Sequence, residues 1–148
     1  MIQTKDEISI HQNYYYDILN KLKNDRYAAY LGMEIIAFNA GEASVQLKAK
    51  EHMLNAHGTI HGGLLYTMAD FAFALACNSY GRTSVGLSTT TNFMKSATEG
   101  DTIIAKASEV RRNNRIGFYR IVIETEKEAI ASIEAVAYRK NHYFISIE

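Results

Sequence analysis

The sequence predicts an α+β domain in which one long apolar helix is wrapped by an antiparallel sheet of about five to six strands. The stretch from about residue 61 to 79 reads as a helix without a polar face, so it must be covered on most sides. The segments around it alternate apolar and polar residues, as strands with one buried face do. With 148 residues, 47% of them hydrophobic, the chain can build one substantial core.

An N-terminal helix is expected over residues 11–30. Ile18, Leu19 and Leu22 share one face at helical spacing, and Gly32 would end the helix. This helix precedes the strands and is an addition to the central helix and its sheet.

Two strands are expected next, over residues 33–38 and 43–50, joined by a turn at Asn39-Ala40-Gly41. The second would bury one face made of alternating apolar residues, which are Ala43, Val45, Leu47 and Ala49. A polar loop over residues 51–59 then leads to the apolar helix, which would stop before Gly81.

The rest of the chain reads as four strands, over residues 84–96, 102–112, 117–126 and 129–140. The breaks between them fall at Glu99-Gly100-Asp101, at Asn113-Asn114 and at residues 126–128.

For domain organisation, we assign residues 1–26 to an N-terminal helical extension and residues 27–148 to the main domain. The N-terminus lacks a basic start followed by an apolar run, so it does not read as a signal peptide. The apolar run of residues 62–77 is short for a membrane span of about 20 residues and contains Asp70. The single cysteine, Cys77, fits a core position in a reducing cytoplasm. We therefore expect a soluble, cytoplasmic protein without membrane contacts.

The charge balance argues against nucleic acid as a partner. Lys+Arg and Asp+Glu both number 16, whereas a nucleic-acid-binding domain needs a basic face. His57 and His61 are four residues apart but have no acidic or cysteine partner that completes a zinc set. Neither a dinucleotide-binding glycine pattern nor a P-loop is present. No metal or redox cofactor is expected.

The Gly62-Gly63 pair stands where the apolar helix begins. The first turn of a helix has unpaired N–H groups at the positive end of the helix dipole, and glycine lets a substrate oxygen come close to them. This arrangement suits an oxyanion hole for a thioester carbonyl. A tight loop-to-helix turn explains the pair equally well.

Asp70 is a carboxylate in the middle of the apolar helix. Burying an ionised Asp costs several kcal/mol unless the group is paired or hydrated, and an active site is one explanation for its presence. It could act as a general base on water or as a nucleophile on an acyl carbon. The structural alternative is a buried Asp that receives hydrogen bonds from the backbone or from hydroxyls.

Asn55, His61 and Ser88 are weaker candidates for catalytic residues when each is considered alone. Asn55 could hold a water or a carbonyl, but an isolated Asn is more often a turn residue. His61 would by default be a structural hydrogen-bonding residue, and Ser88 an ordinary strand hydroxyl. Arg111, Arg112 and Arg115 form the most basic stretch and could meet phosphates, although a solvated turn is the default.

Together these residues resemble a known family. The string Asn55-x-x-Gly58-x-x-His61-Gly62-Gly63 with Asp70, followed by Ala76-Cys77-Asn78-Ser79, is similar to that of the hotdog-fold acyl-CoA thioesterases of the phenylacetate-pathway (PaaI-like) type. The resemblance covers residues from about 27 to 140, and the order of elements inferred above agrees with that fold.

The resemblance implies hydrolysis of an aromatic or medium-chain acyl-CoA to free acid and CoA, in a homodimer or homotetramer with active sites at the dimer interface. Asn55 and Gly62 would come from one protomer and Asp70 from the other. The Gly62 N–H would polarise the carbonyl, with His61 and Gly63 beside it.

In the strand that follows the helix, Ser88 matches an assisting hydroxyl of some relatives, and Thr89 or Thr90 could take its place. The arginine cluster falls where relatives place basic residues near the CoA phosphates.

Two other functions are also compatible with the sequence. A non-catalytic acyl-CoA binding module is one, although such hotdog domains usually lack the carboxylate and carry a DNA-binding extension. A hotdog-fold hydratase or dehydratase is the other, and it would use His61 and Asp70 as its pair. The glycine pair and Asn55 favour thioester cleavage.

Overall fold

The computed structural model describes residues 6–148 of the chain. Six strands form one antiparallel sheet in the order β1-β2-β4-β5-β6-β3, so β1 and β3 are its edges. The elements, in chain order, are α1 (Glu7–Asn13), α2 (Tyr15–Leu22), α3 (Arg26–Leu31), β1 (Glu34–Asn39), β2 (Glu42–Lys48), the short 3-10 helix η1 (Glu51–Met53), α4 (Gly62–Asn78), β3 (Arg82–Phe93), β4 (Thr102–Arg112), β5 (Ile116–Glu124) and β6 (Ala129–Tyr143).

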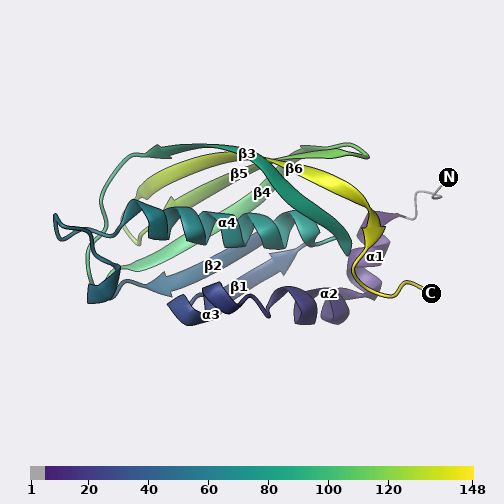
Figure 1. Ribbon diagram of the computed structural model, residues 1–148, viewed down its shortest axis with the longest axis horizontal. Helices are drawn as coiled ribbons and strands as arrows, with labels where there is room; N and C mark the ends of the chain where they lie inside the picture. The colour runs from purple at the N-terminus through teal and green to yellow at the C-terminus, as the bar shows by residue number, and fades with distance from the viewer. Residues whose placement is uncertain (1–5) are drawn as a thin grey trace.

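Helix α4 lies across one face of the curved sheet (Figure 1). Met68, Ala72 and Ala76 are spaced four residues apart, and all three are fully buried. The sheet supplies the other side of this core through residues such as Ile121 and Ile133, also fully or almost fully buried. The predicted arrangement of a long apolar helix on an antiparallel sheet is therefore confirmed.

The N-terminal region differs from the single helix predicted over residues 11–30, because it contains three short helices. Tyr14, with φ −115° and ψ 22°, leaves the helical conformation and separates α1 from α2. The Asp25 carboxylate accepts a hydrogen bond from the Ala28 N–H (2.8 Å) and starts α3. Gly32 ends α3 in the left-handed conformation at φ 80°, as the sequence predicts.

These helices run beside α4 on the β1 side of the molecule (Figure 1). Ile18 is fully buried in the same core as α4, and the buried His11 donates from Nδ1 to the Ser79 carbonyl (2.7 Å). The division of the chain at residue 26 stays a prediction, and residues 1–5 of that extension lie outside the described residues.

The six strands lie where the alternation predicts them, with ends that differ by a few residues. The four residues predicted for the inner face of β2 and its continuation are all buried, and Gly41 closes the β1–β2 turn at φ 75°. The predicted loop over residues 51–59 contains the short helix η1.

Edge strand β3 exposes much of its length. Val85, Leu87 and Phe93 of this strand are exposed large apolar side chains. A bulge between Gly86 and Ser88 shifts its register against β6.

Candidate active site

The start of α4 is capped by the residue before the glycine pair. His61 Nδ1 accepts a hydrogen bond from the Gly63 N–H (2.9 Å), and the His61 carbonyl accepts from the Leu64 N–H (3.0 Å). The Gly62 N–H has no partner among residues 6–148. One first-turn donor thus remains available to an outside acceptor, at the positive end of the helix.

Gly62 also lies close to Phe93, at the end of strand β3. A Cβ at this position would lie 3.3 Å from Phe93 Cζ and 3.4 Å from Cε1. The absence of a side chain therefore keeps both the Phe93 ring and an approaching acceptor close to the Gly62 backbone.

Asn55 holds the loop that precedes α4. Its Oδ1 accepts hydrogen bonds from the N–H groups of His57 (2.9 Å) and Thr59 (3.2 Å), and its Nδ2 donates to the Thr59 hydroxyl (3.0 Å). The His61 N–H in turn donates to the Met53 carbonyl (2.9 Å). The Asn55 amide is therefore engaged in shaping the loop that presents His61 and Gly62.

Asp70 lies on an exposed stripe of α4 together with Gly63 and Tyr66. The expected burial of this carboxylate is thus not found in the single chain, where solvent reaches it. Among residues 6–148 it has no hydrogen-bond or ion-pair partner. Partial burial raises the pKa of Asp70 above its ordinary value, and the negative charge of Asp25 raises it further. An unpaired carboxylate of raised pKa is suited to accepting a proton.

Tyr66 and Thr89 join α4 to β3 beside Asp70. Their hydroxyl oxygens are 2.9 Å apart, and both residues line a small crevice with Asp70. Thr89 therefore shares the Asp70 side of the sheet. Successive strand residues point to opposite faces, so Ser88 is directed to the other face.

Tyr66 and Asp25 lie near Asp70 but are not among the candidate residues predicted from the sequence. The position of Tyr66 four residues before Asp70, on one helical face, was a signal that could have found it.

Within one chain the predicted site residues do not converge. Gly62 and Asp70 are eight residues apart in α4, which corresponds to about 12 Å along the helix axis. The arginine cluster lies at the opposite end of α4, where Arg112 stacks over the Tyr80 ring at 4.1 Å. Gly62 and this cluster are thus separated by the whole helix, about 25 Å long.

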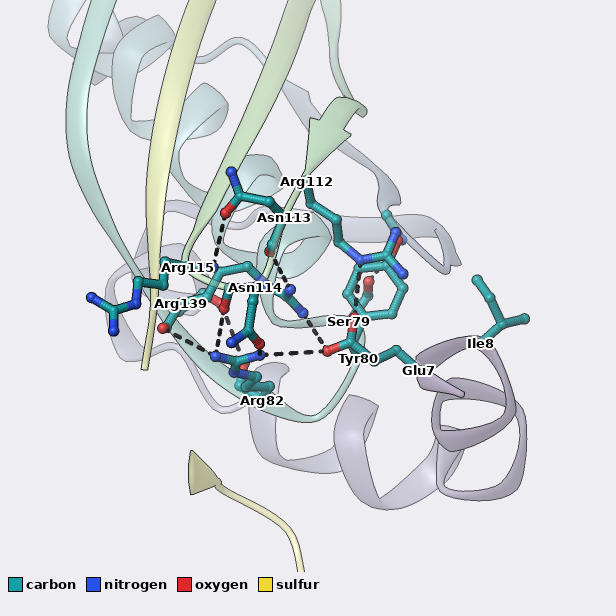
Figure 2. Close-up of polar contacts among 12 residues, drawn as sticks. Glu7, Ile8, Ser79, Tyr80, Arg82, Arg112, Asn113, Asn114, Arg115 and Arg139 are labelled. Atoms are coloured by element: carbon teal, nitrogen blue, oxygen red, sulfur yellow. Dashed lines mark hydrogen bonds and ion pairs between the residues drawn. The ribbon is translucent and has the colours of Figure 1, made fainter. Parts of the chain in front are cut away.

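The arginines of the cluster have different surroundings (Figure 2). Arg112 Nε donates to Glu7 Oε2 (3.1 Å) and its Nη1 donates to Glu109 Oε2 (2.9 Å). Arg139 and Arg82 also pair with Glu7. Arg111 and Arg115 are exposed, and the Arg115 side chain points away from Glu7 and the arginines paired with it.

Cysteine and metal chemistry find little support in residues 6–148. Cys77 is buried as predicted, and burial raises the pKa of its thiol to about 12, which keeps it protonated at neutral pH. In this part of the chain, no group of three or more His, Cys, Asp or Glu side chains is placed to hold a metal ion. None of the helices described is both long enough and apolar enough to cross a membrane.

Comparison with known proteins gives the family. Residues 57–132, half of the chain, match the thioesterase superfamily. The chain belongs to this superfamily. It is 35% identical over 118 residues to the acyl-coenzyme A thioesterase PaaI of Escherichia coli, an alignment that covers 79% of this chain and 84% of that protein. It is also 34% identical over 123 residues to a putative esterase of Archaeoglobus fulgidus, covering 82% of this chain and 80% of the other.

The fold agrees with this membership. The solved structure of the PaaI protein from the phenylacetic acid degradation operon of E. coli superimposes with a TM-score of 0.84 at 30% identity, covering 93% of this chain and 99% of that one. The hotdog fold and the PaaI-like relationship expected from the motif are thereby confirmed.

Proposed function

We propose that this thioesterase-superfamily protein hydrolyses acyl-CoA thioesters to a free acid and CoA. The observation that carries the proposal is that α4 presents both an unpartnered N–H, at Gly62, and an unpaired carboxylate, at Asp70. The chain that presents them is 35% identical to an acyl-coenzyme A thioesterase. One group suits a developing oxyanion and the other suits proton removal.

In the proposed reaction, the Gly62 N–H donates to the thioester carbonyl oxygen and stabilises the negative charge that develops there. Asp70 takes a proton from a water whose oxygen attacks the acyl carbon, and the carbon–sulfur bond then breaks to release the CoA thiolate. Direct attack by the Asp70 carboxylate, followed by hydrolysis of the resulting anhydride, is the alternative course. His61 and Asn55 act as positioning residues for the Gly62 turn.

The active site is proposed to combine two chains. The N–H group that donates to the thioester carbonyl must lie about 3 Å from the carbonyl oxygen, and the attacking atom must lie about 3–3.5 Å from the carbonyl carbon. One chain places Gly62 and Asp70 about 12 Å apart. The exposed edge of β3, with its apolar side chains beside the Asp70 stripe, supports a homodimer formed along this edge. A homotetramer built from such dimers remains part of the proposal.

For CoA phosphates, Arg111 and Arg115 are the proposed contacts, because both are exposed. Arg112 is engaged by Glu7 and Glu109 and contributes to the fold. Thr89, which faces Asp70, is favoured over Ser88 as the strand hydroxyl of the site. Gly63 stays a proposed substrate contact.

The first test is CoA release, followed with a thiol reagent, across acetyl-, phenylacetyl-, dodecanoyl- and palmitoyl-CoA. Wild type should turn over at least one ester, and Asp70→Asn should lower kcat by about 10²-fold or more. Asp17→Asn, an exposed Asp on α2, is the matched control and should retain activity. Tight binding of the esters without turnover would instead favour the binding module.

The two-chain site has a separate test. Asp70→Asn and Gly62→Ala proteins are unfolded, mixed in equal amounts and refolded. If each site takes Gly62 from one chain and Asp70 from the other, the mixed dimers contain one intact site, and about a quarter of wild-type activity should return. Recovery would not exceed the sum of the two variants if both groups acted within one chain.

A further inference from the structure

Phe93 ends the edge strand β3 beside the turn that presents the Gly62 N–H. A Cβ on Gly62 would lie 3.3 Å from Phe93 Cζ, so the ring lies against the Gly62 backbone. The ring is nevertheless 57% exposed in the single chain. It therefore offers apolar surface at the place where the proposed reaction puts the thioester carbonyl.

Strand β3 and helix α4 present their site residues at matching intervals. Thr89 contacts Tyr66 and lines the crevice at Asp70, whereas Phe93 lies against Gly62. Thr89 and Phe93 are four residues apart, which is about 13 Å along a strand, and both point to the helix side of the sheet. Gly62 and Asp70 are about 12 Å apart along α4. Thr89 thus lies level with Asp70, and Phe93 lies level with Gly62.

The part of β3 over residues 88–93 is suited to pairing with a second copy of the chain. Its register against β6 is regular over these residues, because the bulge of β3 lies before them. The segment contains neither a charged residue nor a proline, the residues that commonly block strand addition. At the opposite edge of the sheet (Figure 1), a register shift between Ile35 and Ala37 interrupts β1. A two-fold axis through the β3 edge would make the two paired strands antiparallel.

The register of this pairing follows from the distances that the reaction requires. Asp70 of one chain and Gly62 of the other must reach the same thioester carbonyl. Because Thr89 is level with Asp70 and Phe93 with Gly62, Thr89 must lie opposite the partner's Phe93. In an antiparallel pair of identical strands, Thr91 then lies opposite its own copy. A register shifted by two residues would move the two reacting groups apart by about 7 Å.

In this register the partner's Phe93 lies on the sheet side of the reacting carbonyl. Opposite residues of paired strands have Cβ atoms about 4.5–5.5 Å apart, which brings the ring beside Thr89 and the crevice at Asp70. Buried apolar residues, such as Phe73 and Ile133, form the wall of that crevice. The phosphates of CoA keep it on the solvent side, because burying charge is costly. The acyl group is thereby directed toward the sheet and the ring.

We propose that Phe93 of one protomer packs against the acyl group bound at Asp70 of the other, and so favours apolar acyl groups larger than acetyl. Phe93 is thus a specificity-determining residue, contributed to the site together with Gly62. The inference rests on the proposed thioesterase function and on the two-chain site.

The register has a test that needs no substrate. Opposite residues of an antiparallel pair have Cα atoms about 4.5–5.5 Å apart, a distance that a disulfide spans. Mild oxidation should therefore link Thr91→Cys chains into covalent dimers. Thr89→Cys is the control, because the two copies of this residue would be about 13 Å apart and should stay unlinked. A Thr91→Cys protein that does not link, or equal linking of both variants, would overturn the register.

Calorimetric titration with CoA esters tests the ring without turnover. In an Asp70→Asn background, Phe93→Ala should weaken the binding of hexanoyl-CoA by roughly tenfold or more, since each lost methylene contact costs about fourfold. Binding of acetyl-CoA should stay nearly unchanged, and Phe93→Leu should recover most of the loss. Ile36→Ala removes an apolar side chain of similar exposure from β1 and is the matched control. Equal effects on both esters, or no effect, would overturn the acyl contact. Failure of the Asp70→Asn protein to bind either ester would instead count against the proposed function itself.

Mixed dimers show which chain supplies the ring. Phe93→Ala chains refolded with a large excess of Asp70→Asn chains form mostly mixed dimers, in which the intact Asp70 lies opposite an intact Phe93. The ratio of kcat/KM for hexanoyl-CoA to that for acetyl-CoA should return to the wild-type value in these dimers. The Phe93→Ala homodimer should show a ratio lower by roughly tenfold. Mixed dimers that keep the lowered ratio would overturn the contribution across the interface.

Discussion

The carboxylate of Glu7 and the guanidinium of Arg112 form a hydrogen-bonded ion pair, with Nε and Oε2 3.1 Å apart. The pair joins the first helix to the end of β4, and the same carboxylate also pairs with Arg82 and Arg139. Three guanidinium groups therefore converge on one acidic side chain (Figure 2).

Replacing this carboxylate should destabilise the protein. Glu7→Gln would leave three largely buried arginines without their shared negative charge, and we expect a loss of roughly 3 kcal/mol in the free energy of unfolding. Urea denaturation of wild type and variant measures this loss. Glu134→Gln breaks the exposed pair with Arg120 and should cost less than about 1 kcal/mol. Similar losses in both variants would contradict the structural role of Glu7.

The pH dependence of activity should report the surroundings of Asp70. In the proposed reaction the ionised carboxylate of Asp70 is the reactive form, so kcat/KM should fall as the pH falls through the raised pKa of Asp70. Asp25→Asn removes a negative charge that raises this pKa, and the acid limb of the profile should move to lower pH. Asn also caps helices well, so α3 should persist. A profile unchanged from that of wild type would show that Asp25 does not act on the essential group.

Asp70 should also make stability depend on pH. Because folding raises its pKa, ionising this carboxyl is less favourable in the folded chain, and the free energy of unfolding decreases as the pH rises through the raised value. Asp70→Asn should therefore be more stable than wild type at pH 7. The difference should vanish well below pH 4, near the ordinary Asp pKa of about 3.9. Denaturant midpoints at several pH values test this, and a variant less stable at pH 7 would disagree.

The cap of α4 predicts a graded response at His61. His61→Ala removes the acceptor for the Gly63 N–H and should cost about 1 kcal/mol of stability. His61→Asn supplies another side-chain acceptor and should recover most of this loss. Thermal or urea unfolding compares the three proteins. No difference between the Ala and Asn variants would mean that the cap contributes little.

Gly62→Ala should separate activity from stability. The new Cβ would press on the Phe93 ring at 3.3 Å, and because this ring is 57% exposed, it can move aside. Alanine also has a higher helix propensity than glycine, so the fold should be retained. We expect kcat/KM to fall at least tenfold from a poorer approach to the Gly62 N–H. Unaltered turnover would argue against an oxyanion role.

Local patterns predicted much of the fold because each element has its own periodicity. The apolar helix predicted from about residue 61 to 79 and the alternation in β2 depend on side chains a few positions apart, and the structure confirms both. The breaks within the N-terminal helices were missed because apolar spacing over Ile18 and Leu22 hid the non-helical conformation of Tyr14.

Much of the candidate site could also be located by sequence, but the surroundings of its residues could not. The glycine pair and Asp70 stand on one continuous helix, so their spacing follows from the chain itself. The ion pair of Arg112 with Glu7, which is 105 positions away, and the contact of Tyr66 with Thr89 beside Asp70 depend on how distant segments meet.

The sequence by itself determined the family, the order of the elements and the residue types available for chemistry, because these depend on residues close together in the chain. Only the tertiary structure decided that Asp70 faces solvent on a stripe beside β3, and that Asp25 lies near enough to affect its pKa. The solvent exposure of a side chain and its interaction with a distant charge depend on which segments folding brings together, so the sequence pattern does not predict them.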